Sequence, residues 1–289
     1  MAIDSRLTAY QVACGQRLES LLPSASQRPV ELHEAMMYSA LAPGKRIRPV
    51  LCLAVCEALG GTYEPALDVA CSLELVHCFS LIHDDLPAID NDDLRRGRPT
   101  CHVKFGEAIA ILAGDALFAL AFTAISNSII NDAQKARCVA ILARASGSRG
   151  LVGGEVVDVL TEGRSFTPED LEFIHSMKTG ALIAASCEMG AVCAGCAETG
   201  PFSRYGELMG LAFQVADDLL NETSTAAELG KAAGSDRERG KATYPALFGI
   251  ERSQEHAVEL VDQAIAALPS TLRDGILGEI ARYAVERRN

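Results

Sequence analysis

The sequence predicts an all-α protein, a single-domain helical bundle around a central apolar cavity. Of its 289 residues, 49% are hydrophobic, but only 5% are aromatic and none is tryptophan. A core built from Leu, Ala, Ile and Val suits packed helices, and no stretch alternates between apolar and polar residues as a strand would. The length is at the upper edge of one domain, and no repeat or low-complexity linker divides the chain. We therefore treat residues 1–289 as one domain.

The first half of the chain contains several apolar stretches with helical periodicity, each interrupted by proline or glycine. The expected helices lie at 5–21, 30–41, 50–59, 65–85 and 105–128. Pro87 disfavours helical backbone at Leu86, so the fourth helix should end there. Asp90 then lies on non-helical backbone and can fold back towards Asp84. The fifth helix is very apolar, and its one central acid, Asp115, is expected to be buried.

The second half continues the same pattern. Its expected helices lie at 132–148, 167–196, 202–222, 252–267 and 271–287, and an apolar stretch at 148–163 follows the first of them. Thr167 followed by Pro168 is typical of a helix N-cap and first helical position. The paired glycines Gly153 and Gly154 indicate a kink or a site of close packing. The polar segment 222–245 is expected to be a loop that covers the functional site.

The overall charge and the cysteines limit the possible partners and location. The net charge is −12, which argues against nucleic acid or an anionic membrane as a partner. Most of the ten cysteines lie in apolar helical stretches, and no secretory signal is evident, so we expect reduced thiols in a cytoplasmic protein. Cys193 and Cys196 form a CxxC without a second pair at zinc spacing. No apolar run is expected to span a membrane, since Asp115 and Glu188 interrupt the best candidates.

The stretch HDDLPAIDNDDLRRG, residues 83–97, carries the strongest chemical signal. It combines five aspartates with Arg95 and Arg96 directly after an apolar helix. Carboxylates bind Mg²⁺ together with substrate phosphates, and arginine matches phosphate oxygens, so a magnesium–diphosphate site is predicted. The alternative is a solvated acidic turn. An EF-hand loop is excluded, because its sixth and twelfth positions are Arg95 and Cys101.

Two further motifs accompany this stretch. GKRIRP, residues 44–49, places three cations at the start of an apolar helix, where anions bind well. His77 lies seven residues before Asp84 and therefore on the same helix face; the alternative is an ordinary core histidine. A second acidic cluster, GLAFQVADDLLNE at residues 210–222, ends a later helix with Asp217 and Asp218.

Taken together, these motifs resemble the trans-polyprenyl diphosphate synthases, and most of all the bacterial enzymes that make farnesyl diphosphate. The resemblance covers essentially the whole chain. It implies the isoprenoid synthase fold and head-to-tail prenyl transfer. In this reaction an allylic diphosphate ionises, isopentenyl diphosphate attacks the allylic cation, and a proton is lost. It also implies a homodimer, and it points to no nucleic acid and no membrane as partners.

The resemblance assigns roles to residues of this chain. Asp84, Asp90 and Asp217 would hold three Mg²⁺ ions, with Asp85 and Asp218 behind them. The allylic diphosphate would meet Arg95, Lys178, Lys231 and Lys241. The diphosphate of isopentenyl diphosphate would be held by Gly44, Lys45, Arg48, His77 and Arg96. Thr179 and Gln214 would offer oxygen dipoles to the allylic cation, so that Lys178, Thr179 and Gln214 form the catalytic set.

Two positions bear on product and activity. In the family, an aromatic residue four or five positions before the first aspartate motif tends to floor the product pocket. These positions are Ser80 and Phe79 here, which predicts a fifteen-carbon product. The family's second motif is DDxxD, but this chain has Asn221 at its third acidic position. We expect an active enzyme with at most a raised Mg²⁺ requirement.

Several alternatives stay open at this point. The product could have twenty carbons (geranylgeranyl) or ten (geranyl). The chain could be an inactive partner subunit, for which Asn221 is the one hint. A terpene cyclase would not explain GKRIRP, His77 and Arg96, because it has no second diphosphate to hold.

Overall fold

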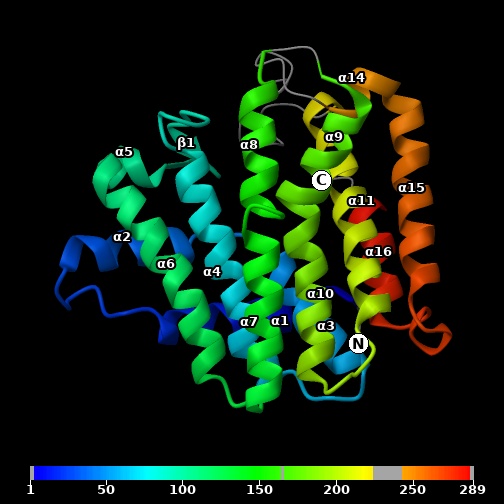
Figure 1. Cartoon of the computed structure of the whole chain (residues 1–289), viewed down its shortest axis with the longest axis horizontal. Helices are drawn as coiled ribbons and strands as arrows, with labels where there is room; N and C mark the ends of the chain where they lie inside the picture. The colour runs from blue at the N-terminus through cyan, green and yellow to red at the C-terminus, as the bar shows by residue number, and fades with distance from the viewer. Residues whose placement is uncertain (1–2, 164–165, 224–242, 287–289) are drawn as a thin grey trace.

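The computed structural model describes residues 3–163, 166–223 and 243–286, and this part of the chain is almost entirely helical (Figure 1). The prediction of an all-α fold is confirmed. Lys231 and Lys241, which the sequence assigns to the allylic diphosphate, lie outside the described residues.

The predicted helices appear in the predicted order with shifts at their ends, and the structure adds two short helices at Cys101–Phe105 and Tyr244–Phe248. Those before residue 164 are α1 (Ile3–Leu21), α2 (Val30–Ala40), α3 (Ile47–Ala58), α4 (Leu67–Asp84), α5 (Cys101–Phe105), α6 (Glu107–Asn127), α7 (Asp132–Ser146) and α8 (Leu151–Thr161). Those after it are α9 (Pro168–Ile174), the π-helix η2 (His175–Gly180), α10 (Ala181–Cys193), α11 (Gly200–Thr223), α14 (Tyr244–Phe248), α15 (Ile250–Ala267) and α16 (Ile276–Glu286). Short 3₁₀ turns at Glu64–Ala66 and Ser270–Leu272 precede α4 and α16.

Three helices, α3, α4 and α10, form the centre of the bundle and bury most of their side chains. Helix α4 packs mainly against α6, while α10 packs against α3, α7 and α11. Small residues let α10 approach its neighbours, since a Cβ at Gly190 would overlap the backbone carbonyl of Cys52 on α3. The two clusters of functional residues described below are therefore carried by rigid, buried elements.

One short β-hairpin was not expected from the sequence. Strand β1 (Leu94–Arg95) pairs antiparallel with β2 (Arg98–Pro99). The two residues between them, Arg96 and Gly97, have positive φ angles of 53° and 74°. Two successive positive φ angles define the hairpin turn whose twist matches the strands. The prediction of no strands missed it because two-residue strands are too short to show alternation.

Helix α6 faces outward more than the sequence suggested. By length and composition alone, Glu64–Asp84 and Glu107–Asn127 could each cross a membrane, a test that core helices of soluble proteins also pass. Of these stretches 72% and 39% are buried, respectively. Asp115 interrupts the apolar run of α6, as the sequence indicates. Asp115 is exposed rather than buried because it lies on the outer face of α6.

Helix α9 begins as predicted. The Thr167 side chain accepts a hydrogen bond from the Asp170 backbone N–H, and the Asp170 carboxylate accepts from the Thr167 backbone N–H. This reciprocal capping box satisfies two amides at the helix start.

All ten cysteines are free thiols, and nine of them are buried.

Candidate active site

Helix α4 carries the two ends of the candidate site on one face. It ends at Asp84, and the chain then turns so that the Asp90 backbone N–H donates to the Asp84 carbonyl oxygen at 2.8 Å. This is the fold-back predicted from Pro87. The two aspartates assigned to metal binding are thereby brought together, with His77 two helical turns below Asp84.

A cluster of carboxylates and one lysine surrounds Asp84. Lys178, on the π-helix, donates a hydrogen bond of 2.6 Å to Asp158 Oδ2 on α8, and its Nζ lies 2.7 Å from Glu155 Oε2. The Glu155 carboxylate is buried, and Lys178 is the cation that faces it. Three elements distant in sequence, α4, α8 and the π-helix, therefore meet at this point.

The electrostatics of this cluster are unbalanced. Burial and the neighbouring Glu155 raise the pKa of Asp84 to about 7, against the opposing effect of Lys178, and Asp90 raises it further. Burial also raises the pKa of Glu155. Although burial opposes its charge, Asp158 and Glu155 raise the pKa of Lys178 above its usual value. Because one lysine cannot neutralise this many buried carboxylates, the cluster has an electrostatic need for further positive charge.

A cluster of opposite sign surrounds His77. Burial lowers the pKa of His77 well below its usual value, and so do the positive charges around it. In decreasing order of effect, these charges belong to Arg48, Arg96, Arg95 and Arg46. The buried Nε of Arg48 has no hydrogen-bond partner. Burial lowers the pKa of Arg48 as well, and the nearby Arg96 contributes. A neutral histidine beside a guanidinium that has a buried nitrogen without a partner among the described residues suits an anion.

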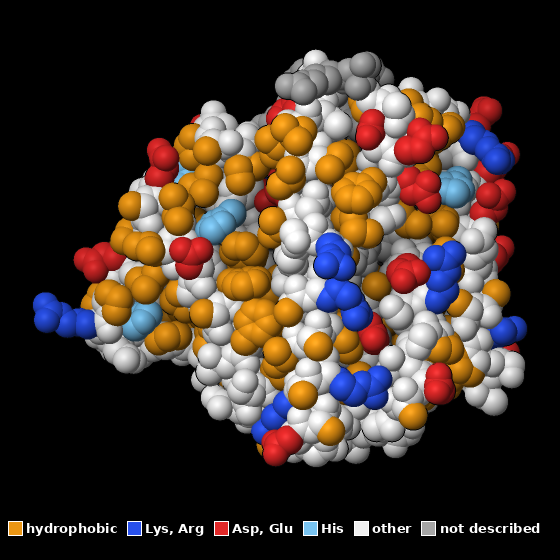
Figure 2. All heavy atoms as spheres, viewed as in Figure 1, with side chains coloured by type: hydrophobic (Ala, Val, Ile, Leu, Met, Phe, Trp, Pro, Cys, Tyr) orange, Lys and Arg blue, Asp and Glu red, His pale blue; other side chains and the backbone are white. Residues whose placement is uncertain are grey.

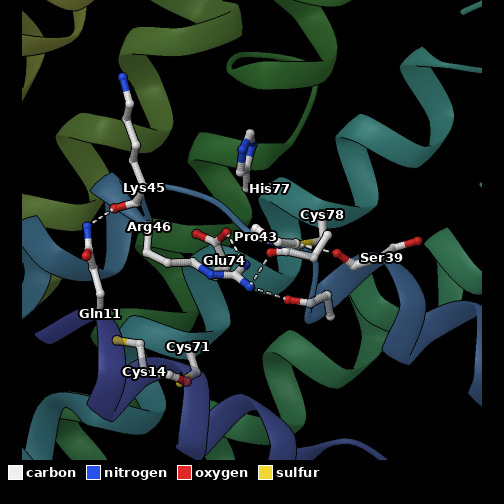
Figure 3. A network of polar contacts seen from close by, with 12 residues as sticks. Gln11, Cys14, Ser39, Pro43, Lys45, Arg46, Cys71, Glu74, His77 and Cys78 are labelled. Atoms are coloured by element: carbon white, nitrogen blue, oxygen red, sulfur yellow. Dashed lines mark hydrogen bonds and ion pairs between the residues drawn. The ribbon is translucent and has the colours of Figure 1, made fainter. Parts of the chain in front are cut away.

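The three cations of GKRIRP have different tasks, and Figure 3 shows two of them, Lys45 and Arg46. Arg46 forms an ion pair of 2.6 Å with Glu74 and donates to the carbonyl oxygens of Ala40 and Ala42. These bonds hold its backbone at a positive φ of 49° and so shape the loop. In Figure 3 the side chains of Lys45 and His77 extend away from this network to the same side. Arg46 is therefore structural, whereas Arg48 remains available for a ligand.

The hairpin brings its two arginines to different places. Arg95 pairs with Asp85, with Nε to Oδ1 at 2.8 Å and Nη2 to Oδ1 at 2.6 Å. Arg96 donates to the Pro43 carbonyl at 2.5 Å, and a Cβ on Gly44 would overlap its guanidinium. Gly44 and Arg96 are therefore adjacent, which agrees with the prediction that both hold the diphosphate of isopentenyl diphosphate. Arg95 keeps one nitrogen, Nη1, for a further partner.

The catalytic set assigned from the sequence meets between the π-helix and α11. The Thr179 hydroxyl donates to Gln214 Oε1 at 2.9 Å, and Gln214 Nε2 donates to Asp218 Oδ1 at 3.1 Å. The π-helix was not predicted, and such single turns often occur at functional sites. On α11, Asp218 is buried whereas Asp217 is exposed.

An apolar pocket of about 320 Å³ opens beside Asp84. It lies between α4 and α8. Its lining residues are Phe79, Ser80, His83, Asp84, Ile89, Leu151, Val152, Glu155, Val156, Val159 and Leu160. The Phe79 ring packs against His83 and, on α6, Phe118, with ring centroids 4.8 and 5.0 Å away. Both residues assigned to chain length therefore line a pocket that begins at Asp84.

The sequence analysis missed Glu155 and Asp158. The signal was present, because two acids three residues apart on one helix face interrupt an otherwise apolar stretch at 148–163. It was not used, because nothing in the local sequence indicates that the lysine opposite them is Lys178.

Comparison with known proteins accounts for this arrangement. The polyprenyl synthetase family model matches residues 29–274. The chain belongs to the polyprenyl synthetase family. It is 45% identical over 283 residues to the large subunit 1 of the heterodimeric chloroplastic geranylgeranyl pyrophosphate synthase of Arabidopsis thaliana. That match covers 94% of this chain and 76% of the relative.

Two solved structures of this family are similar over nearly their whole length. An FPP/GFPP synthase from Zymomonas mobilis superposes with a TM-score of 0.86 at 37% identity, covering 98% of each chain. A geranyltransferase from Helicobacter pylori, complexed with magnesium and isoprenyl diphosphate, superposes with a TM-score of 0.82 at 33% identity. It covers 97% of this chain and 96% of its own. The chain is therefore a prenyltransferase and belongs to the short-chain prenyl diphosphate synthases.

The family depends on Mg²⁺, and the residues around Asp84 fit such an ion. Buried carboxylates that raise one another's pKa are a donor set suited to a hard divalent cation. Within residues 3–163, 166–223 and 243–286, no three His, Cys, Asp or Glu side chains lie close enough together to hold a metal by themselves. Mg²⁺ commonly completes its coordination with substrate phosphates and water, so two carboxylates and a diphosphate suffice.

Proposed function

We propose that this chain makes geranylgeranyl diphosphate by head-to-tail condensation of isopentenyl diphosphate with allylic diphosphates. The observation that carries the proposal is the pair of opposite clusters on α4, with an apolar pocket beginning at one of them. One cluster suits a diphosphate directly, and the other suits a diphosphate that arrives with cations. A reaction with two diphosphate substrates and one apolar chain needs these three features.

In this proposal the His77 cluster holds isopentenyl diphosphate. Arg48 and Arg96 donate to its phosphate oxygens, and Lys45 closes over them from the loop that Arg46 shapes. The Gly44 backbone belongs to the same cradle, because the Arg96 guanidinium lies where a side chain at position 44 would begin. A neutral His77 can donate one hydrogen bond without adding to the crowded positive charge.

The allylic diphosphate binds at the Asp84 cluster. Asp84, Asp90 and Asp217 would hold Mg²⁺, for which we propose three ions, and these neutralise the diphosphate as a leaving group. Lys178 lies beside Asp84 and can donate to the same diphosphate, while Arg95 offers its remaining nitrogen. Thr179 faces the carbon from which the diphosphate departs and stabilises its positive charge, and Gln214 orients the Thr179 hydroxyl.

Two observations bear on the length of the product. The relative from Arabidopsis thaliana is named a geranylgeranyl pyrophosphate synthase, which supports twenty carbons. In addition, the Phe79 ring packs towards α6 against Phe118, which suits a side wall of the pocket better than a floor. The sequence-based expectation of a fifteen-carbon farnesyl product is therefore the second candidate. It is favoured by the presence of Phe79 at the pocket and by the FPP/GFPP name of the Zymomonas mobilis structure.

We further propose that the chain acts as a dimer of identical subunits. Hydrophobic side chains gather on the face formed by α6 and α8 (Figure 2). They include Ile111 and Leu112 on α6, and Val152 and Val156 on α8, all exposed in the single chain. An apolar surface of this kind marks an interaction site. The relative named a heterodimeric large subunit makes a different partner the alternative. A cytoplasmic location of this chain is likewise a proposal.

Product analysis tests the proposed function. Purified protein is incubated with Mg²⁺, isopentenyl diphosphate and, separately, dimethylallyl, geranyl or farnesyl diphosphate, and the dephosphorylated alcohols are separated by length. We expect geranylgeraniol from all three. Farnesol from the first two and no elongation of the third would favour the farnesyl synthase. No elongation at all would favour an inactive partner subunit and make Asn221→Asp the reversion to attempt.

The Phe79→Ala variant sharpens the result. If Phe79 is a floor, the variant's product is longer than the wild-type product. If it is a side wall, the distribution of lengths is unchanged. Phe173→Ala is the matched control, because Phe173 is an exposed aromatic on α9 that does not line the pocket.

A further inference from the structure

A chain of directed hydrogen bonds runs from Asp218 to Thr179. A carboxylate accepts hydrogen bonds only, so Gln214 must turn its NH₂ group towards Asp218. Its amide oxygen is then turned towards Thr179, whose hydroxyl must donate to it. The charge on Asp218 thereby fixes the direction of both bonds, and the lone pairs of the Thr179 oxygen point away from Gln214.

Asp218 itself is held from its other side. The Tyr244 backbone N–H donates to Asp218 Oδ2 at 3.0 Å, and His175 Nε2 lies 3.6 Å from the same oxygen. The Tyr244 ring is stacked between His175 and His256, with centroid distances of 5.4 and 5.3 Å. With 5% of its surface exposed, Asp218 is enclosed by these partners, and its position depends little on solvent.

The backbone that carries Thr179 is fixed as well. A Cβ on Gly210 of α11 would overlap Gly180, and one on Gly154 of α8 would overlap Lys178. The π-helix is therefore clamped between two helices at backbone contact. What remains free at Thr179 is the direction in which its hydroxyl hydrogen points, and Gln214 determines it.

We propose that Asp218 is a positioning residue for prenyl transfer. Through Gln214 it keeps the Thr179 hydroxyl hydrogen turned away from the allylic cation, so that the electron-rich side of the oxygen faces the developing positive charge. Hydrogen bonds in a chain polarise one another, and a terminal carboxylate strengthens this effect. The inference rests on the proposed function, in which Thr179 faces the cation.

Removing the charge of Asp218 should reverse the chain. In Asp218→Asn, the oxygen of the new amide still accepts from the Tyr244 N–H, so its NH₂ group faces Gln214. Gln214 must then turn its own oxygen to that NH₂ group and its own NH₂ group to Thr179, and the Thr179 hydrogen is released towards the cation. We expect kcat to fall about 10- to 100-fold, the range for a charged hydrogen bond, with the KM for isopentenyl diphosphate unchanged.

A charge exchange provides the decisive experiment. In the double variant Gln214→Glu with Asp218→Asn, the amide at position 218 donates to the carboxylate at position 214, and this carboxylate again accepts from Thr179. The net charge is that of the wild type, and we expect kcat to return to within about fivefold of it. A double variant as slow as Asp218→Asn, or a single variant as fast as the wild type, overturns the proposal.

A double-mutant cycle guards against a purely structural effect. On a Thr179→Val background, Asp218→Asn should lower kcat no further, because Asp218 acts through the missing hydroxyl. A loss as large as in the wild-type background overturns the proposal. The wild type is assayed in parallel. If it elongates no allylic diphosphate, the proposed function and this inference both fail; if it is active, the variants test the inference alone.

Discussion

The clusters around His77 and Asp84 lie two turns apart on the same helix and have opposite charge. At His77 the arginines outnumber their carboxylate partners, since Arg46 and Arg95 are paired but Arg48 is not. At Asp84 the carboxylates outnumber the single lysine. The first cluster can bind an anion directly, whereas the second becomes an anion site only after cations bind. The two substrates can thus be distinguished although both present a diphosphate.

The largest expected effect comes from the carboxylate cluster. Asp84→Asn should lower kcat by about 10³-fold, because the charge that holds the activating cations is lost. Steady-state rates at saturating Mg²⁺ measure it. Asp93→Asn is the matched control, since it removes the same charge from an exposed position in the segment that follows α4. If Asp84→Asn lowers kcat less than tenfold, the Asp84 cluster does not depend on bound cations in the way that we describe.

Although Asp84→Asn should lower kcat, it should raise the stability of the metal-free protein. The pKa of Asp84 is raised to about 7, so the folded state holds its proton more tightly than the unfolded state. Without metal, this site therefore costs stability as the pH rises from about 4 to 7, and Asp84→Asn removes the cost. From pH 5 to pH 8 in EDTA, the free energy of unfolding of the variant should rise by roughly 3 kcal/mol relative to that of the wild type. Urea unfolding at both pH values measures this, and a pH-independent difference would contradict it.

At the cationic cluster, Arg48 and Arg46 should respond differently. Arg48→Gln should raise the KM for isopentenyl diphosphate about 10- to 100-fold through loss of a charged hydrogen bond, with the half-saturating Mg²⁺ concentration unchanged. Arg46→Gln should instead lower the free energy of unfolding by about 3–5 kcal/mol, because it leaves the buried Glu74 unpaired. Kinetics and urea unfolding of both variants test the pair, and an exchange of the two effects would reverse our assignment.

The smallest effect concerns the hairpin turn. Gly97→Ala should destabilise the protein by about 1 kcal/mol, because alanine is strained at a φ of 74°. Since the turn positions Arg96, the KM for isopentenyl diphosphate should rise a few-fold. Gly60→Ala carries the same strain at a φ of 85°, at the end of α3, and should leave that KM unchanged. If the two variants have the same KM for isopentenyl diphosphate, the hairpin turn does not position Arg96 for substrate binding.

The sequence by itself determined the long helices and the residues of both clusters except Glu155 and Asp158. The periodicity of the apolar residues, the cap at Thr167 and the stop at Pro87 act within a few residues, so they can be recognised locally. The fold-back of Asp90 towards Asp84 followed from the same local argument. The family resemblance named the candidate residues, because the charged motifs are contiguous in the chain.

Only the tertiary structure decided which charges are paired. Lys178 meets Asp158 and Glu155 across 20 and 23 positions of sequence, and nothing local separates the paired Arg46 from the unpaired Arg48. The π-helix likewise depends on neighbours, since its backbone is clamped by glycines of α8 and α11. The strength of these charge pairs depends on burial and on contacts between distant residues. Such contacts form only once the helices have packed together.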